Sequence, residues 1–132
     1  MSRVPRSQEH LKTGFTSEAS AAARYRAYAE AARREGLPKL ADSWLELAEA
    51  KDELAIRQLA AAGKVHGSER ALADEIAEDR FENDVLYPKI IRDLGADEAA
   101  EVFREVVAAQ EAHIERLTDL KQRLQAATGD ID

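Results

Sequence analysis

The sequence predicts an all-α fold, built from four long helices arranged as two helical hairpins. Apolar residues recur at alternating steps of three and four, which is the spacing of one helical face. Glycine and proline residues divide the chain into four stretches, and no strand-like alternation competes with this pattern. A chain of 132 residues with 45% hydrophobic side chains is long enough for one core and too short for two. We therefore expect a single domain spanning residues 1–132.

The first hairpin is delimited by capping residues. The first helix is predicted to begin at Ser7, which can cap its N-terminus, and to end before Gly36, which can adopt the left-handed conformation that closes a helix. Pro38 fits the first turn of the second helix, because a proline there removes no helical hydrogen bond. Gly63 then ends the second helix.

The second hairpin follows a short link. Ser68 is the predicted cap of the third helix, Gly95 ends that helix, and Asp97 caps the fourth. Pro88 falls inside the third helix and is expected to kink it, because proline lacks a backbone donor and crowds the preceding turn. The four predicted helices are residues 7–35, 38–62, 68–94 and 97–126.

Composition excludes several classes of function. A net charge of −7 repels phosphate backbones, which argues against nucleic acid as a partner. Cysteine is absent, so any metal must be bound by carboxylates and by the three histidines, of which His10 and His66 are expected to be solvated. No apolar run could span a bilayer and no leader pattern is visible, so we expect a soluble cytoplasmic protein without a membrane partner.

Each predicted helix carries polar side chains near its middle, on the apolar stripe that should face the other three. Burying a charge costs several kcal/mol unless the charge is paired or bound to a metal, so these groups are expected to converge on one central site. For any single residue, a buried polar group that only specifies the packing is the simpler interpretation. Carboxylates and imidazole suit iron, manganese or zinc. The residues expected to converge are Glu18, Lys51, Asp79, Glu82, Gln110 and His113, of which Glu18, Asp79, Glu82 and His113 are the predicted metal ligands. Asn83 also falls on the stripe of the third helix.

Five segments of the chain carry a resemblance to a known family, at residues 14–20, 24–29, 35–38, 82–88 and 103–113. Together they resemble rubrerythrins and the related sulerythrin, which belong to the ferritin superfamily. The likeness covers nearly the whole chain, although the rubredoxin module of many rubrerythrins is missing, consistent with the absence of cysteine. The resemblance implies a ferritin-like four-helix bundle and a carboxylate-bridged di-iron centre that reduces hydrogen peroxide.

The ligand pattern of that family is only partly present. Glu18, Asp79, Glu82 and His113 match ligand positions of the resemblance. The Glu-x-x-His pair of the second helix is replaced by Lys51 and Leu54, and the bridging glutamate of the last helix is replaced by Gln110. Both bridging carboxylates and one histidine are therefore missing, and we do not expect a full di-iron centre.

Two interpretations of this degenerate centre stay open. Lys51 is expected to lie within ion-pairing distance of Glu18, Asp79 or Glu82, in the place of one metal. The remaining ligands could then hold one iron, manganese or zinc ion for peroxide or dioxygen chemistry of the rubrerythrin type, with an electron donor that the sequence does not identify. Alternatively, the lysine and carboxylates form a metal-free network in a scaffold or binding module. Tyr25 and Tyr87 are expected to line the site, either by hydrogen-bonding its carboxylates or by ordinary core packing.

The link between the hairpins predicts a homodimer. In a ferritin-like bundle the second and third helices run parallel, so their link must travel back along the bundle. With Leu54 and Asp79 at one level, the return is about 28 Å, whereas the six steps from Ala62 to Ser68 reach only about 21 Å. Either a helix end unwinds or the hairpins are exchanged between two chains.

Overall fold

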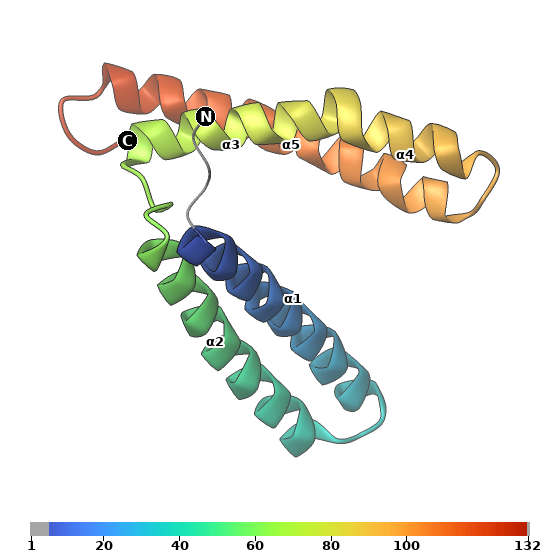
Figure 1. Cartoon of the computed structure of the whole chain (residues 1–132). Helices are drawn as coiled ribbons and strands as arrows, with labels where there is room; N and C mark the ends of the chain where they lie inside the picture. The colour runs from blue at the N-terminus through green and yellow to red at the C-terminus, as the bar shows by residue number, and fades with distance from the viewer. Residues whose placement is uncertain (1–5, 132) are drawn as a thin grey trace. The chain divides into compact units, whose positions relative to one another are not determined.

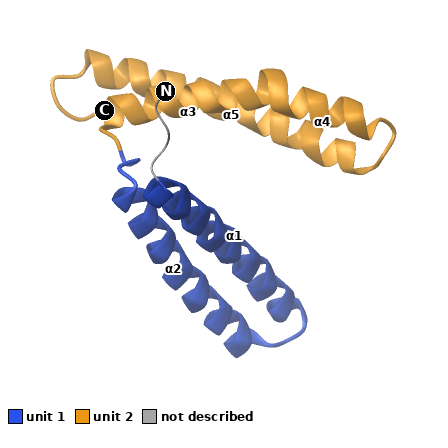
Figure 2. Ribbon diagram, in the orientation of Figure 1, with its two compact units in different colours: residues 1–65 blue, residues 66–132 orange. Residues whose placement is uncertain are grey.

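The computed structural model describes residues 6–131, and helices form all of the regular secondary structure in that range, without a strand (Figure 1). Four helical rods follow one another, as predicted, and pair into two helical hairpins. The hairpins are two compact units, Met1–Val65 and His66–Asp132 (Figure 2). Among the described residues, none of the helices combines the length and apolar character needed to cross a bilayer.

The first hairpin consists of α1 (Arg6–Arg34) and α2 (Pro38–Ala61). Gly36 has a φ of 79°, and the Leu37 N–H donates to Ala32 O at 2.9 Å, so the predicted left-handed glycine does end α1. The helices pack through small side chains. Between residues 6 and 65, the buried residues are Ala21, Ala22, Ala29, Ala32, Ala41, Ala48, Ala55 and Ala62.

Three leucines of the predicted α2 stripe are not covered by α1. Leu40, Leu47 and Leu54 are 48%, 52% and 43% exposed, whereas the alanines that follow them by one residue are buried. Alanine allows a close approach of the two helix backbones, so the α1 contact is centred on the alanines rather than on the leucines.

The second hairpin pairs one interrupted rod with α5 (Ala99–Ala126). The rod consists of α3 (Ser68–Phe81), a π-helical turn η1 (Glu82–Leu86) and α4 (Tyr87–Leu94). The predicted disruption at Pro88 takes the form of this π turn, in which the Tyr87 N–H donates to Glu82 O, five residues back. The additional residue in the turn accommodates the proline ring, which would crowd the carbonyl four residues back in a regular α-helix.

The helix ends predicted at glycine residues are found in the structure, whereas the helix starts predicted at serine residues are not. Gly95 has a φ of 58° and ends α4, as predicted. The N-cap of α5 is Glu98 and not the predicted Asp97, although Asp97 Oδ1 accepts a hydrogen bond from the Ala99 N–H at 2.8 Å. The predictions for Ser7 and Ser68 were wrong. Ser7 lies inside α1, and Gly67 is the N-cap of α3, where its extended backbone makes the turn without a side-chain hydrogen bond.

Candidate functional site

An ion pair links the two helices of the first hairpin. Lys51 Nζ on α2 lies 2.7 Å from Glu18 Oε2 on α1, which confirms the predicted pairing of Lys51 with a seam carboxylate. The side chains are 31% and 23% exposed, and Glu18 Oε2 itself is closed to solvent. Hydrogen bonding to Glu18 raises the pKa of Lys51 above its ordinary value of 10.5, against the opposing effect of desolvation. Lys51 is therefore a fixed positive charge next to the first predicted ligand.

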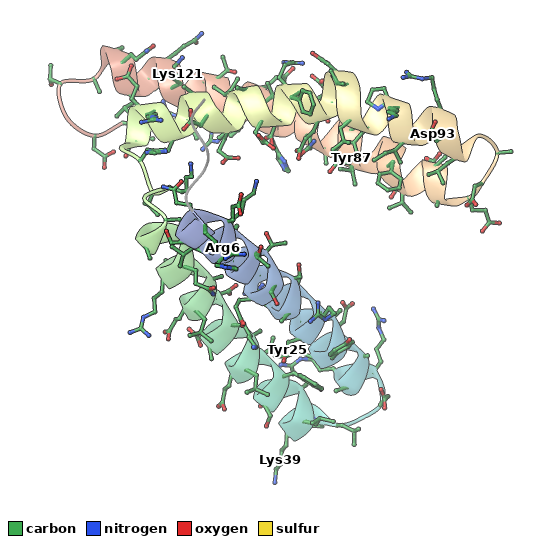
Figure 3. All side chains as sticks on the ribbon, in the orientation of Figure 1. Arg6, Tyr25, Lys39, Tyr87, Asp93 and Lys121 are labelled. Carbon is green, nitrogen blue, oxygen red and sulfur yellow. The ribbon has the colours of Figure 1, made fainter. Side chains whose placement is uncertain are left out.

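Aromatic rings pack beside this ion pair. The Tyr25 ring lies 5.0 Å from Trp44 on α2 and 6.4 Å from Tyr28, and Figure 3 labels Tyr25 on α1. No hydrogen bond from Tyr25 occurs among residues 6–131 of the structure. The Tyr25 ring thus packs against other aromatic rings, and Leu54, which was also predicted to line the site, is exposed.

Carboxylates gather on one side of α3 and η1 in the second hairpin. Burial and then the Asp79 carboxylate raise the pKa of Glu75 above its ordinary value. Burial also raises the pKa of Tyr87, with further contributions from Glu82 and Asp79. Both predicted carboxylate ligands of this hairpin thus lie close enough to Tyr87 to act on it. The Tyr87 ring also packs on Phe103 at 5.8 Å, and Figure 3 labels Tyr87 on α4.

Asp79 and His113 line the same pocket, an open hollow of about 300 Å³ between α3 and α5. Glu75, Arg116 and Leu117 complete the lining. Asp79 is half-buried and His113 is exposed, so imidazole and carboxylate face one space that solvent can reach. The structure therefore brings together one predicted carboxylate ligand and the predicted histidine ligand.

Gln110 belongs to a hydrogen-bond network that the sequence did not predict. Its Nε2 donates to Asn83 Oδ1 at 2.8 Å, and Asn83 Nδ2 donates to Val107 O at 2.9 Å and to Glu111 Oε1 at 3.2 Å. Arg80 donates to both carboxylate oxygens of Glu111 at 3.2 and 3.4 Å. The only signal in the sequence was the presence of two amides on the inward stripes of neighbouring helices.

The residues present do not fit a two-metal centre. Two divalent ions a few ångströms apart require bridging carboxylates to offset their repulsion. At the two positions that the sequence resemblance assigns to bridging carboxylates, Lys51 is a cation paired with Glu18 and Gln110 is an amide hydrogen-bonded to Asn83. Across residues 6–131, acidic and histidine side chains do not form a group of three that could hold a metal ion. Glu18 lies in the first unit, whereas Asp79, Glu82 and His113 lie in the second. Of the other histidines, His10 is exposed and His66 is half-buried.

Comparison with known proteins agrees with the resemblance seen in the sequence. The rubrerythrin family model matches residues 9–84, which span α1, α2, α3 and the start of η1. The rubrerythrin of Nitratidesulfovibrio vulgaris (strain Hildenborough) is 26% identical over 135 aligned residues, which cover 90% of this chain and 71% of that protein. The matched region includes Glu18, Lys51, Asp79 and Glu82, the residues around which the candidate site is built. The chain belongs to the rubrerythrin family.

Proposed function

We propose that this protein is a rubrerythrin-family bundle that has lost its paired metals and serves as a scaffold or binding module. The observation that supports this proposal is the 2.7 Å contact between Lys51 Nζ and Glu18 Oε2. By resemblance, Lys51 stands where the family has a bridging carboxylate. An ammonium at that position adds positive charge where two metal ions need negative charge, and it neutralises one of the remaining ligands.

A single bound metal ion is the second candidate, and one specific observation favours it. Asp79 and His113 line one pocket, and the side-chain carboxylates of Asp79 and Glu82 make no ion pair or hydrogen bond among the residues that the structure describes. Two carboxylates and one imidazole are the donors that suit iron, manganese or zinc. Such an ion would supply peroxide or dioxygen chemistry, as in a non-haem iron peroxidase or oxidase of the rubrerythrin type.

Metal analysis of the purified protein separates the two candidates. The chain should be prepared without a histidine tag, exchanged into chelator-free buffer and analysed for iron, manganese and zinc by mass spectrometry. Traces of metal support the scaffold. Near-stoichiometric metal that His113→Ala or Asp79→Asn removes would overturn the scaffold and support the single-ion centre. Metal that neither substitution removes would contradict both assignments.

We also propose that the bundle forms from hairpins exchanged between two chains. The α2 helix ends at Ala61 and α3 begins at Ser68, so neither helix end has unwound. With Leu54 and Asp79 at one level, the link must return about 27 Å, and seven fully extended steps reach about 24 Å. The link is also not fully extended at its start, because Gly63 has a φ of 72° and the Lys64 N–H donates to Leu59 O at 3.2 Å. This capping turn shortens the reach further and favours a homodimer.

A further inference from the structure

Asn83 is the only buried polar residue in the part of the chain that the structure describes, and it lies within the π turn. Its side chain is 5% exposed, and a buried amide must satisfy both its donor and its acceptor. All three of its hydrogen bonds go to α5, to Val107 O, Glu111 Oε1 and Gln110 Nε2. The amide therefore ties the centre of η1 to the centre of α5.

The neighbours of Asn83 dictate which way its amide faces. The Val107 carbonyl can only accept a hydrogen bond, and the Glu111 carboxylate, held by Arg80, can also only accept. Both therefore require the Asn83 NH₂ group on their side. The carbonyl oxygen of Asn83 must then face position 110, and position 110 must supply a donor. The NH₂ group of Gln110 supplies it at 2.8 Å.

We infer that Asn83 is a positioning residue that specifies an amide at position 110 and disfavours a carboxylate there. The inference rests on the proposed function in one respect, the assignment of position 110 to a lost bridging carboxylate. A glutamate at 110 would direct a carboxylate oxygen at Asn83 Oδ1. If the Asn83 amide turned over, its oxygen would instead face the Val107 carbonyl and the Glu111 carboxylate. Either arrangement places two acceptors against each other at Asn83, which is itself buried.

Two features therefore oppose a two-metal centre in this chain: the missing ligands, and the preference of Asn83 for an amide at position 110. Restoring the ligand pattern by Lys51→Glu, Leu54→His and Gln110→Glu leaves the Asn83 oxygen opposite the new carboxylate. Serine at position 83 removes this conflict, because its hydroxyl can rotate to donate to a carboxylate or to accept from an amide.

The first experiment tests, without any metal, whether Asn83 disfavours a carboxylate at position 110. Gln110→Glu is made in the natural chain and in the Asn83→Ser chain, and urea unfolding of all four proteins is measured in chelated buffer. We expect Gln110→Glu to raise the unfolding equilibrium constant at least about fivefold more in the natural chain than in the Asn83→Ser chain. An equal effect in the two backgrounds overturns the inference. If Gln110→Glu prevents folding in both, side-chain amide hydrogen exchange in the natural chain decides: slow exchange at Asn83 and Gln110 supports the inference, and exchange at the rate of free amides overturns it.

The second experiment measures whether Asn83 lowers the metal affinity of a chain in which the ligand pattern has been restored. The triple variant and the same variant with Asn83→Ser are titrated with Mn²⁺ and Zn²⁺, and Asn83→Ser alone is the control. We expect the quadruple variant to bind at least about tenfold more tightly than the triple, the scale on which outer partners of a ligand act. If the triple and quadruple variants bind metal with equal, measurable affinities, Asn83 does not oppose metal binding and this part of the inference is wrong. If neither variant binds metal, the assignment of these positions to a lost metal centre is wrong, whereas the unfolding experiment still decides whether Asn83 specifies the amide.

Discussion

The side chain of Gln58 on α2 fills the space over Gly14 on α1. A Cβ added at Gly14 would lie 1.6 Å from Gln58 Oε1 and 2.7 Å from its Cδ. The amide is held there because Gln58 Nε2 donates to Leu54 O at 3.1 Å. A side chain at position 14 would therefore overlap the Gln58 amide, and Gln58 would have to move to make room for it. This contact lies in the same α1–α2 pair as the Lys51 ion pair.

Gly14→Ala is expected to show this exclusion as a coupling with Gln58. Alanine inside a helix is favoured over glycine by about 1 kcal/mol, but here it must displace the Gln58 side chain. We expect little or no gain in the free energy of unfolding from Gly14→Ala alone. In the Gln58→Ala background, the same substitution should gain about 1 kcal/mol. Urea unfolding of the four proteins measures both effects, and equal gains in the two backgrounds would show that Gln58 does not occupy this space.

Lys51→Met is expected to destabilise the protein in a pH-dependent manner. The substitution removes the charge that pairs with Glu18, whose Oε2 is closed to solvent. The pKa of Lys51 is raised in the folded state, so its stabilising contribution is fully present below 10.5 and is lost as the pH rises through the folded value. The difference in free energy of unfolding between the natural chain and Lys51→Met should therefore be constant near neutral pH and shrink above pH 10.5.

Two control variants isolate the ion pair. Lys51→Arg keeps the charge and should retain most of the stability. Lys39→Met removes an exposed lysine of α2 that makes no ion pair among the described residues, and it should have little effect at any pH. A pH-independent loss for Lys51→Met would assign the role of Lys51 to the packing of its carbon chain instead of to its charge.

Glu75→Gln is expected to stabilise the protein at neutral pH. Burial and the Asp79 carboxylate one turn away raise the pKa of Glu75 in the folded state, so the ionised form carries a penalty above that pKa. The penalty disappears as the pH falls below 4.5, the ordinary value for this group. The gain should reach about 0.5 kcal/mol, the scale of a like-charge pair one helical turn apart.

The matched control for this variant is Glu115→Gln on α5. Glu115 is exposed and makes no ion pair among residues 6–131 of the structure, so its substitution should leave the free energy of unfolding nearly unchanged. Chemical unfolding at neutral pH and at about pH 4 compares the two variants. A stabilisation by Glu75→Gln that persists unchanged at the lower pH would argue against relief of charge repulsion.

Lengthening the link between the hairpins is expected to convert an exchanged dimer into a monomer. About eight glycine and serine residues inserted after Gly63 would add more than the few ångströms that the link lacks, at a small entropic cost. Light scattering at dilute concentration should show a dimer for the natural chain and a monomer for the lengthened chain. The same insertion between Gly95 and Asp97 should leave the dimer intact, because it does not alter the link. A natural chain that is monomeric, or a lengthened chain that stays dimeric, would contradict hairpin exchange.

The sequence alone determined the helical class, the position of the turns and the pairing of Lys51 with a carboxylate of the inward stripes. Gly36, Gly63 and Gly95 end helices because their positive φ is costly for other residues, and this preference is local. The Lys51 contact was also predictable, because a short turn joins α1 and α2 and leaves little freedom in their register. The serine caps failed because Ser7 is already helical and because the extended backbone of Gly67 forms the N-cap of α3.

Only the tertiary structure decided how the second half of the site is organised. Pro88 signals a disruption in the sequence, but whether it produces a kink, a break or a π turn depends on how the rod packs against α5. The π turn adds a residue to the rod and so changes which side chains face α5. Asn83, the partner of Gln110, lies within this turn. A stripe pattern can place two amides on facing helices, but their pairing requires a register set by long-range packing, which local residue preferences do not contain.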